Sequence, residues 1–474
     1  MDVRYTLDEM AAVWSYESKY TLWVKSCLAV LFALASLDRI GKNIYTTIRR
    51  AAGFDLETVE KLDKKYKQDA QALIEACKLH MRSLGIPEDV IVHFGNMITS
   101  YDMEDPAFAR LICLATDIII KSLERMIKTL RRRAMEFEYT LCLFETHGQG
   151  AGPGYLGIRL CNWIDILERD LQRIRRARRN MQIGRFAGII GVYGELDPEV
   201  EKIACKYLKL KSARISTQIL HRDRHADLMN ALALCATNVD HIATTLWAMC
   251  GYPKCEAREA FDWINQRGST GMPHKRNPWR LERLSGMASA MRGYQLMVME
   301  QVKTPFERAI SQSSVERIAW VDGTTLLHFM LEELDSIFSR MEFFPENMQQ
   351  NLDGFNGVLA SQHIKDLLRK KGIFKLRFSP TGYLRSELIR CGKMDEADYA
   401  LEVETYDWVK YCVYEAWDMK TNRSIDHLRN VVVRQGIEVF LTHEELDECF
   451  DLKRGLAHAD EIYARFHLIT SGVA

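Results

Sequence analysis

The chain has 474 residues, of which 47% are hydrophobic and 27% are charged, a normal globular composition with enough core for two or three domains. Lys and Arg together number 64, as do Asp and Glu, so the formal charge is zero. This balance argues against general binding to nucleic acid or to a membrane surface, but it is compatible with a local basic site for a small anion.

The start of the chain carries no recognisable targeting or membrane signal. The segment MDVRYTLDEM is polar and lacks the apolar region of a signal peptide. Residues 26–37 (SCLAVLFALASL) are apolar but too short to span a bilayer, so we expect a buried helix there. The 12 cysteines form no CxxC pair and have no histidine pair at zinc spacing beside them. Reduced thiols in a cytoplasmic protein, with no bound metal, are therefore predicted.

Prolines and apolar spacing predict long helices. Only 10 prolines occur, and none lies between Pro106 and Pro153, between Pro153 and Pro198, or between Pro198 and Pro253. Long helices tolerate no interior proline, and these gaps have a suitable length for them. Within the last gap, apolar residues recur every three to four positions over residues 226–239. Because strand-like alternation is nearly absent, we predict an all-α fold.

The helical pattern divides the chain into three predicted domains. Residues 1–92 form short helices broken by Gly and Pro, residues 93–342 hold the longest helical patterns, and residues 343–474 are again shorter helices. The middle helices are apolar around most of their circumference and need partners on several sides. We therefore predict a long central helical bundle whose burial is completed in an oligomer.

Two basic runs lie within the predicted helices, at residues 131–133 and 173–179. Their simplest interpretation is a solvated helix face or ion pairs between subunits. Neither run has the interleaved aromatic residues that single-stranded nucleic acid requires, so no nucleic-acid partner is predicted.

Residues 268–278 (GSTGMPHKRNP) concentrate positive charge and backbone freedom in one short loop. Asn277 followed by Pro278 is a good helix start, with Asn as the N-cap and Pro in the first helical position, so the positive end of a helix would face the loop. Lys275 and Arg276 add charge, and the glycines let the backbone approach a ligand. These features predict a site for a carboxylate that gains negative charge during a reaction.

This loop resembles the signature loop of the fumarase/aspartase superfamily, GSSxMPxKxNP. Other motifs narrow the resemblance to the adenylosuccinate lyases and run through nearly the whole chain: RYTLDEMAAVW at 4–14, TSYDMED at 99–105, THGQ at 146–149, GVYGELDPEVE at 191–201, STQILHRDRHAD at 216–227 and ERAISQSSVER at 307–317. The resemblance implies a three-domain fold, no cofactor, and a homotetramer whose active sites are shared among three subunits. It also implies an anti β-elimination that releases fumarate.

The resemblance assigns roles in the reaction to four residues. Ser269 is the implied base that removes a proton beside a carboxylate, and His147 is the implied acid that protonates the leaving amine. Lys275 and Asn277 are the expected donors to the dianionic enolate-like intermediate, each worth about 3 kcal/mol. A serine base requires a positive, water-poor pocket, which a closing loop would provide.

The resemblance also implies a set of residues that hold a nucleotide substrate, among them three arginines for its phosphate. The predicted substrate-binding residues are Arg4, Tyr5, Lys67, Gln68, Asp69, Thr99, Ser100, Thr146, Gln218, Lys275, Asn277, Arg283, Arg308, Ser313 and Arg317. The residues expected to support the site structurally are Thr270, Met272 and Glu282.

Some positions depart from the family pattern on the substrate side. Gln68 stands where the family carries the histidine of an Arg-His-Asp triplet, and an amide cannot carry charge or relay a proton. Four further positions replace residues that are common in the family, and one segment looks like an insertion: Glu145, Gly154, Tyr155, Ala309 and residues 374–390.

The resemblance implies cleavage of adenylosuccinate to AMP and fumarate, and of the purine-pathway ribotide SAICAR to AICAR and fumarate, in the cytoplasm. Two alternatives stay open: a paralogous lyase that acts on another N-substituted succinate or aspartate, and a catalytically weakened homologue kept as a structural or regulatory partner. Retention of Ser269, His147 and Lys275 speaks against the second alternative. Retention of Arg308 and Arg317 favours a nucleotide over a bare amino acid.

Overall fold

The computed structural model describes residues 2–468, and the chain divides into two compact units. The first unit comprises Met1–Thr129, Asp165–Thr245 and Arg276–Ser339, and the second comprises Leu130–Ile164, Leu246–Lys275 and Arg340–Ala474. Several unit boundaries fall inside long helices, so these helices contribute residues to both units. The three domains expected from the sequence, with boundaries after residues 92 and 342, stay a prediction.

The N-terminal part of the first unit consists of short helices and one longer one. They are η1 (Val3–Tyr5), α1 (Asp8–Trp14), α2 (Tyr16–Ser36), α3 (Lys42–Ala51), α4 (Leu56–Tyr66), α5 (Asp69–Ser83) and α6 (Glu88–Ile91). Their apolar faces meet in one core, which α2 and the start of α7 also enter through Trp23, Leu28 and Met103.

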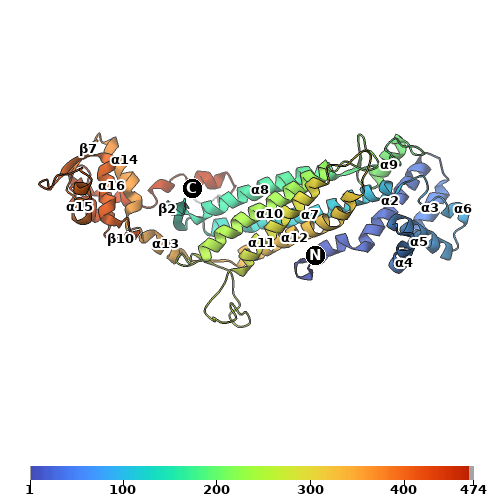
Figure 1. Ribbon diagram of the computed structural model, residues 1–474, viewed down its shortest axis with the longest axis horizontal. Helices are drawn as coiled ribbons and strands as arrows, with labels where there is room; N and C mark the ends of the chain where they lie inside the picture. Colours follow the sequence, from blue (N-terminus) through green and yellow to red (C-terminus); the bar gives the residue numbers. More distant parts are fainter. Residues whose placement is uncertain (1, 469–474) are drawn as a thin grey trace, which may run out of the picture. The chain divides into compact units, whose positions relative to one another are not determined.

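The five longest helices of the described chain run side by side as a bundle (Figure 1). They are α7 (Ser100–Glu136), α8 (Leu156–Met181), α10 (Asp223–Cys250), α11 (Trp279–Glu300) and α12 (Ser311–Arg340), with the shorter α9 (Pro198–Tyr207) before α10. Fully buried side chains such as Leu123, Leu232 and Leu327 repeat along these helices. The bundle gives the all-α prediction its physical basis, since each helix buries an apolar stripe against its neighbours.

The second unit carries the remaining helices and most of the short strands. Its C-terminal elements are α13 (Pro345–Asp353), η2 (Val358–Ala360), α14 (Ser361–Lys370), α15 (Gly382–Arg390), α16 (Thr405–Ala416), α17 (Leu428–Arg434), η3 (Ile437–Val439), α18 (His443–Phe450), η4 (Arg454–Leu456) and α19 (Ala459–Ala464). A separate core forms among α14 to α18, centred on Trp408 and Phe378. Thr442 begins α18 with a capping box to Glu445.

The strands described in the structure are short and pair only two at a time. They are β1 (Leu141–Thr146), β2 (Gln149–Tyr155), β3 (Ile183–Gly184), β4 (Lys211–Ser212), β5 (Ala257–Arg258), β6 (Glu342–Phe343), β7 (Lys375–Phe378), β8 (Leu401–Glu404), β9 (Trp417–Asp418) and β10 (Arg423–Ser424). The insertion-like residues 374–390 contain β7 and α15. The strands link helices and do not form a sheet of their own that could hold a core.

Helix α2 confirms the buried helix expected over residues 26–37. Ser15 caps its start through a hydrogen bond from the Ser18 amide, and Cys27, Val30 and Leu34 are fully or almost fully buried. By length and composition α2 could cross a membrane, but 72% of its most apolar window is buried within the protein. All 12 cysteines lie in the described chain and none forms a disulfide.

The prolines mark helix starts in two places and fail to do so in a third. Pro198 and Pro345 occupy the first turns of α9 and α13, as a missing amide N–H allows. Pro106, the first residue of a proline-free stretch in the sequence, lies inside α7 in its second turn. A proline there removes one amide hydrogen bond near the start of a helix of 37 residues, and the helix tolerates that loss.

The basic runs form ion pairs within the two units. In the run at residues 173–179, Arg173 pairs with Asp170, and Arg178 pairs with Asp117 through two nitrogens at 2.8 and 2.9 Å. In the other run, Arg133 is buried and donates to the Met341 carbonyl. The ion pairs of Arg173 and Arg178 thus lie within the chain and not between subunits, and Arg133 is buried and not solvated.

Candidate active site

Asp69, at the start of α5, pairs with two positively charged side chains. Its carboxylate accepts hydrogen bonds from the Lys19 ammonium at 3.1 Å and from the Arg317 guanidinium at 3.2 Å. The neighbouring Gln68 lies 3.5 Å from the Ser100 hydroxyl, at the limit of hydrogen bonding. The fold thus brings α2, α5, α7 and α12 together at one point of the first unit.

The sharp connection between α4 and α5 presents these side chains. Lys67 ends α4 in the left-handed conformation, with φ of 55°, and Gln68 then begins α5 in an extended conformation without capping it through its side chain. The amide of Gln68 therefore points away from its own helix and toward α7. Thr99 precedes α7, and its amide donates to the Asp102 carboxylate at 2.9 Å.

Arg308 joins the same group from the loop before α12. Its guanidinium donates to the Gln218 side-chain oxygen at 2.8 Å and lies 4.0 Å from the centroid of the Tyr101 ring. Ser313 lies in the first turn of α12, one turn before Arg317. The hydroxyl, the amide and the two guanidinium groups are types that hold a phosphate or a ribose.

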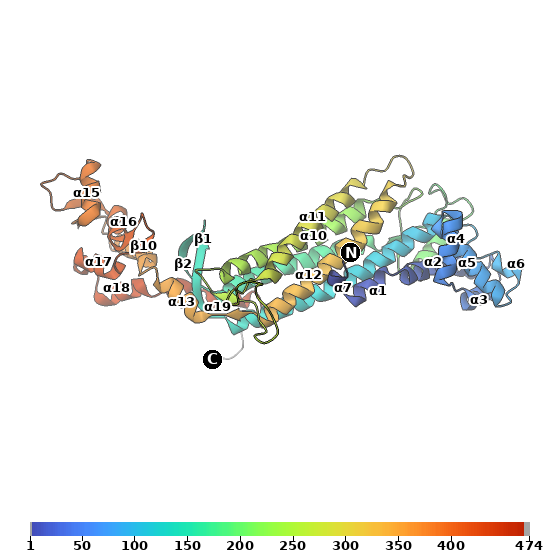
Figure 2. The same ribbon diagram turned by 60° about the horizontal axis from the view of Figure 1, so that its bottom comes forward.

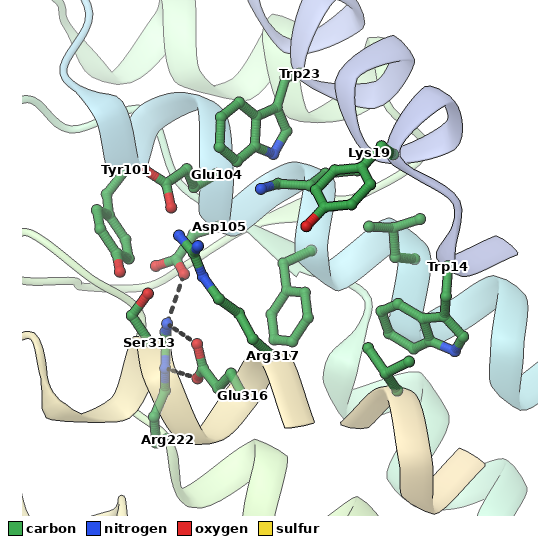
Figure 3. Close-up of a pocket in the computed structure, with 14 residues that line it drawn as sticks. Trp14, Lys19, Trp23, Tyr101, Glu104, Asp105, Arg222, Ser313, Glu316 and Arg317 are labelled. Atoms are coloured by element: carbon green, nitrogen blue, oxygen red, sulfur yellow. Dashed lines mark hydrogen bonds and ion pairs between the residues drawn. The ribbon is translucent and has the colours of Figure 1, made fainter. Parts of the chain in front are cut away.

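A cavity of about 310 Å³ opens beside this group, between α2, α7 and α12 (Figure 3). Its walls combine charged side chains with aromatic ones, among them Trp14, Trp23, Tyr101 and Phe108. Trp14 is held by a hydrogen bond from its indole nitrogen to the Thr324 hydroxyl at 2.9 Å. The cavity therefore has fixed apolar walls and an edge of charged groups.

One side of the cavity is closed by a buried triad of Asp105, Arg222 and Glu316. The Arg222 guanidinium lies 2.9 Å from Asp105 and 2.7 Å from Glu316, and it also donates to the Leu220 carbonyl. Figure 3 shows the contacts of Arg222 with Asp105 and with Glu316 as dashed lines. Burial raises the pKa of Glu316, although the charge of Arg222 opposes that shift. The triad fixes the start of α12 against α7.

A second group of predicted residues lies on α11 and near the N-terminus. The Arg283 guanidinium pairs with Glu333 and lies 5.9 Å from the centroid of the Tyr5 ring and 4.7 Å from that of Trp279. Glu282 precedes it on α11. Arg4, on the same short helix as Tyr5, has an exposed side chain.

His147 lies at the tip of the β1–β2 hairpin in the second unit. Figure 2 shows the two strands of this hairpin. His147 and Gly148 form the two-residue turn, both with positive φ, which is the geometry of a tight hairpin turn. The hairpin projects the imidazole and the adjacent Thr146 into solvent. Glu145, which differs from the residue common in the family, forms an ion pair with Lys254 at 2.5 Å. This ion pair anchors the hairpin beside its tip.

The other two hairpin residues that differ from the family pattern, Gly154 and Tyr155, lie at its base. Gly154 packs so closely on Phe144 that an added Cβ would lie 2.5 Å from the ring, and Tyr155 is buried with its ring 5.5 Å from that of Tyr139. These positions support the hairpin and do not offer hydroxyl groups at its tip.

The loop at residues 268–278 is exposed over residues 270–275, which include Thr270, Met272 and Lys275, whereas Ser269 is half-buried. The Ser269 hydroxyl accepts a hydrogen bond from the Met272 amide at 3.3 Å, and the Lys275 amide donates to the Met272 carbonyl. In the described chain no hydrogen bond joins Ser269 to His147, although both belong to the second unit.

The helix after this loop starts later than we expected. Helix α11 begins at Trp279, its N-cap is Pro278, and no side chain caps it. Asn277 is therefore not the N-cap, because Pro278 has a ψ of 58° and leaves the helical path before the first turn closes. The side-chain amide of Asn277 is thereby not committed to a capping hydrogen bond.

The sequence pattern of a lyase family matches residues 5–293 of the chain. The adenylosuccinate lyase of Bacillus subtilis (strain 168) is 34% identical over 467 residues, which cover 98% of this chain and 99% of that protein. The adenylosuccinate lyase of Synechocystis sp. (strain ATCC 27184 / PCC 6803 / Kazusa) is 32% identical over 465 residues, which cover 98% of this chain and 99% of that protein.

The chain belongs to the fumarase/aspartase superfamily of lyases.

Solved structures of other lyases and related enzymes share its fold. A fumarate lyase from Mesorhizobium sp. BNC1 matches with a TM-score of 0.79 and 20% identity over 97% of both chains. A 3-carboxy-cis,cis-muconate lactonizing enzyme from Pseudomonas putida matches with a TM-score of 0.79 and 22% identity, over 97% of this chain and 96% of that chain. These likenesses confirm the all-α superfamily fold.

The lyase fold sorts the predicted site residues into distinct groups. Around Asp69 lie Lys67, Gln68, Thr99, Ser100, Gln218, Arg308, Ser313 and Arg317; on α11 and near the N-terminus lie Arg4, Tyr5, Glu282 and Arg283; on the hairpin lie Thr146 and His147; and in the loop or directly after it lie Ser269, Thr270, Met272, Lys275 and Asn277. The roles of these residues in binding and catalysis stay predictions. No group of three or more His, Cys, Asp or Glu side chains could hold a metal ion within residues 2–468.

Sequence reasoning missed three residues of the group around Asp69: Lys19, Tyr101 and Glu104. The signal for the last two was present, since Tyr101, Glu104 and Phe108 recur at helical spacing on one face of α7. Lys19 carried no comparable signal, because its partner Asp69 lies 50 positions away in the sequence.

Proposed function

We propose that the protein is an adenylosuccinate lyase, which cleaves adenylosuccinate to AMP and fumarate and SAICAR to AICAR and fumarate. The observation that carries this proposal is the identity of 34% and 32% to two adenylosuccinate lyases over 98% of the chain. Within that length the chain retains the loop residues Ser269, Lys275 and Asn277, and it retains His147 at an exposed hairpin tip. These residue types are those that an elimination beside a carboxylate requires.

In the proposed reaction, Ser269 takes the proton from the carbon beside the succinyl carboxylate. The electron pair left on that carbon makes an enolate-like dianion, and Lys275 and Asn277 donate hydrogen bonds to it. The carbon–nitrogen bond then breaks, fumarate is formed, and His147 gives a proton to the departing nitrogen. The exposure of residues 270–275 supports a role for the loop as a flap that excludes water when it closes on substrate.

The groups around Asp69 and around Arg283 supply the cations for the rest of a nucleotide. Arg308, Ser313 and Arg317 are proposed to hold its phosphate, with Gln218 beside Arg308. The described chain shows no hydrogen bond between the proposed base and acid, which fits an active site assembled from several copies of the chain. We therefore propose a homotetramer in the cytoplasm with sites shared among three subunits.

The test is an assay of fumarate release, followed by ultraviolet absorbance, with adenylosuccinate, SAICAR, argininosuccinate and aspartate as substrates. We expect activity with the first two only. Activity confined to another succinate or to aspartate would identify a paralogous lyase, and no release from any of the four would indicate a non-catalytic homologue.

The Ser269→Ala variant should lose about 10²–10⁴-fold in kcat while it still binds adenylosuccinate, because only the proton-removing group is gone. The exposed Ser289→Ala on α11 is the matched control and should keep full activity. Mixing Ser269→Ala with His147→Gln subunits should restore activity through sites with both residues intact. A Ser269→Ala enzyme with more than a few percent of the normal rate would refute the assignment of the base.

A further inference from the structure

An acidic side chain lies among the residues proposed to hold the phosphate. Glu104, on α7, lines the same cavity as Ser313 and Arg317 on α12 and Lys19 on α2. Figure 3 shows the side chains of Glu104, Lys19 and Arg317 directed toward one space. Glu104 forms no hydrogen bond or ion pair with another residue of the described chain, so its carboxyl group is available to a ligand.

The charges around Glu104 come from every element that packs against the cavity. They are Lys19 on α2, Asp69 at the start of α5, Asp105 on α7, Arg222 before α10, Arg308 before α12, and Glu316 and Arg317 on α12. The phenols nearby are Tyr16 and Tyr101.

These charges balance closely enough that Glu104 decides the net charge. Lys19, Arg308 and Arg317 contribute three positive charges, and Asp69 contributes one negative charge. The buried triad contributes one further negative charge, since its two carboxylates face a single guanidinium. One positive charge is therefore left over when Glu104 is neutral, and none is left when it is ionised. The neutral form therefore attracts an anion more strongly than the ionised form.

The surroundings of this carboxyl group favour its neutral form. Burial, followed by the negative charge of Asp69, raises the pKa of Glu104 to about 8, while Lys19 and Arg308 act in the opposite direction. A neutral carboxylic acid can donate a hydrogen bond, whereas a carboxylate can only accept one. A phosphate oxygen requires donors and is repelled by a carboxylate.

We propose that Glu104 determines specificity for the phosphate of the substrate by donating a hydrogen bond to one of its oxygens as a neutral acid and repelling it as a carboxylate. This inference rests on the proposed function, because it takes the substrate to be a nucleotide bound by Arg308, Ser313 and Arg317. It adds a residue to the site that the sequence motifs did not assign.

The experiment compares kcat/KM across pH for the wild-type enzyme and Glu104→Gln, whose amide keeps a donor but cannot ionise. With adenylosuccinate, the kcat/KM of the wild type should fall about tenfold between pH 7 and pH 9, through KM, as the free enzyme loses this proton. Glu104→Gln should not show that fall. The exposed Glu60→Gln on α4 is the control and should follow the wild type.

A second arm uses the dephosphorylated nucleoside as substrate. With the wild-type enzyme, the kcat/KM for this nucleoside should not show the fall between pH 7 and pH 9 that is expected for adenylosuccinate. The nucleoside has no phosphate that the Glu104 carboxylate could repel. If Glu104→Gln does not fold, as judged by circular dichroism, the difference between nucleotide and nucleoside profiles of the wild type decides the question. Parallel profiles for the two substrates, or for the wild type and a folded Glu104→Gln, would overturn the inference. An enzyme that releases no fumarate from any substrate would refute the proposed function instead.

Discussion

The buried triad of Asp105, Arg222 and Glu316 gives a quantitative prediction about stability. The Arg222 side chain is 1% exposed and faces both carboxylates of the triad, at 2.9 and 2.7 Å. Replacing it by Met keeps much of the volume but leaves two buried acids without a positive charge beside them, although Asp105 still accepts a hydrogen bond from the Leu220 amide. Breaking a buried ion pair in this way typically costs about 3–5 kcal/mol, so Arg222→Met should lower the free energy of unfolding by that amount at pH 8.

The loss should shrink at lower pH, and the sign follows from proton binding. Burial already raises the pKa of Glu316 above its ordinary value in the folded protein, and removal of Arg222 removes the charge that opposed this shift. A folded state that binds protons more tightly than the unfolded state loses stability as pH rises from the unfolded pKa of about 4.3 toward the folded one. The difference between Arg222→Met and the wild type should therefore be smaller at pH 5 than at pH 8.

Urea unfolding followed by circular dichroism at the two pH values measures both effects. Arg125→Met is the matched control: it breaks a pair with Glu332 in the same unit, but its side chain is 50% exposed, so it should cost less than about 1 kcal/mol. If Arg222→Met cost no more than Arg125→Met, or if its cost were the same at pH 5 and pH 8, the assignment of the triad as a buried charge network would be wrong.

Three further variants test the site and its support. Gly150→Ala places a Cβ 2.3 Å from the Phe355 ring, so it should lower the free energy of unfolding by about 1–3 kcal/mol and lower kcat by displacing the hairpin. Its control, Gly152→Ala, meets no atom within 4 Å and should be tolerated. Melting curves and fumarate release measure both variants, and equal effects would refute the steric argument. Gln68→Ala should leave the melting temperature nearly unchanged, because its side chain is exposed and its hydrogen bond is long, but should raise KM for adenylosuccinate; an unchanged KM would remove it from the site. Glu104→Gln should remove the loss of stability that the raised pKa imposes on the wild type as pH rises from about 4.5 to about 8, and a wild-type-like pH dependence of unfolding would contradict this.

Local patterns predicted the helices well where a helix depends on nearby residues. The apolar spacing over residues 226–239 lies within α10, and the apolar run at 26–37 lies almost entirely within the buried α2. Local rules failed where a single residue departs from its usual preference. Pro106 lies inside α7, and His147 takes a positive φ to close a hairpin that the alternation of its short strands did not reveal.

The sequence by itself determined the helical class, the superfamily and the chemical types in the loop at residues 268–278, because each is written in short contiguous motifs or in helical periodicity. Only the tertiary structure decided that Asp69 holds Arg317, a residue 248 positions away, and that Glu104 faces the same cavity. The physical reason is that the charge state of a buried acid depends on the solvent it loses and on cations from other helices. Neither quantity is set by the neighbours of that acid along the chain.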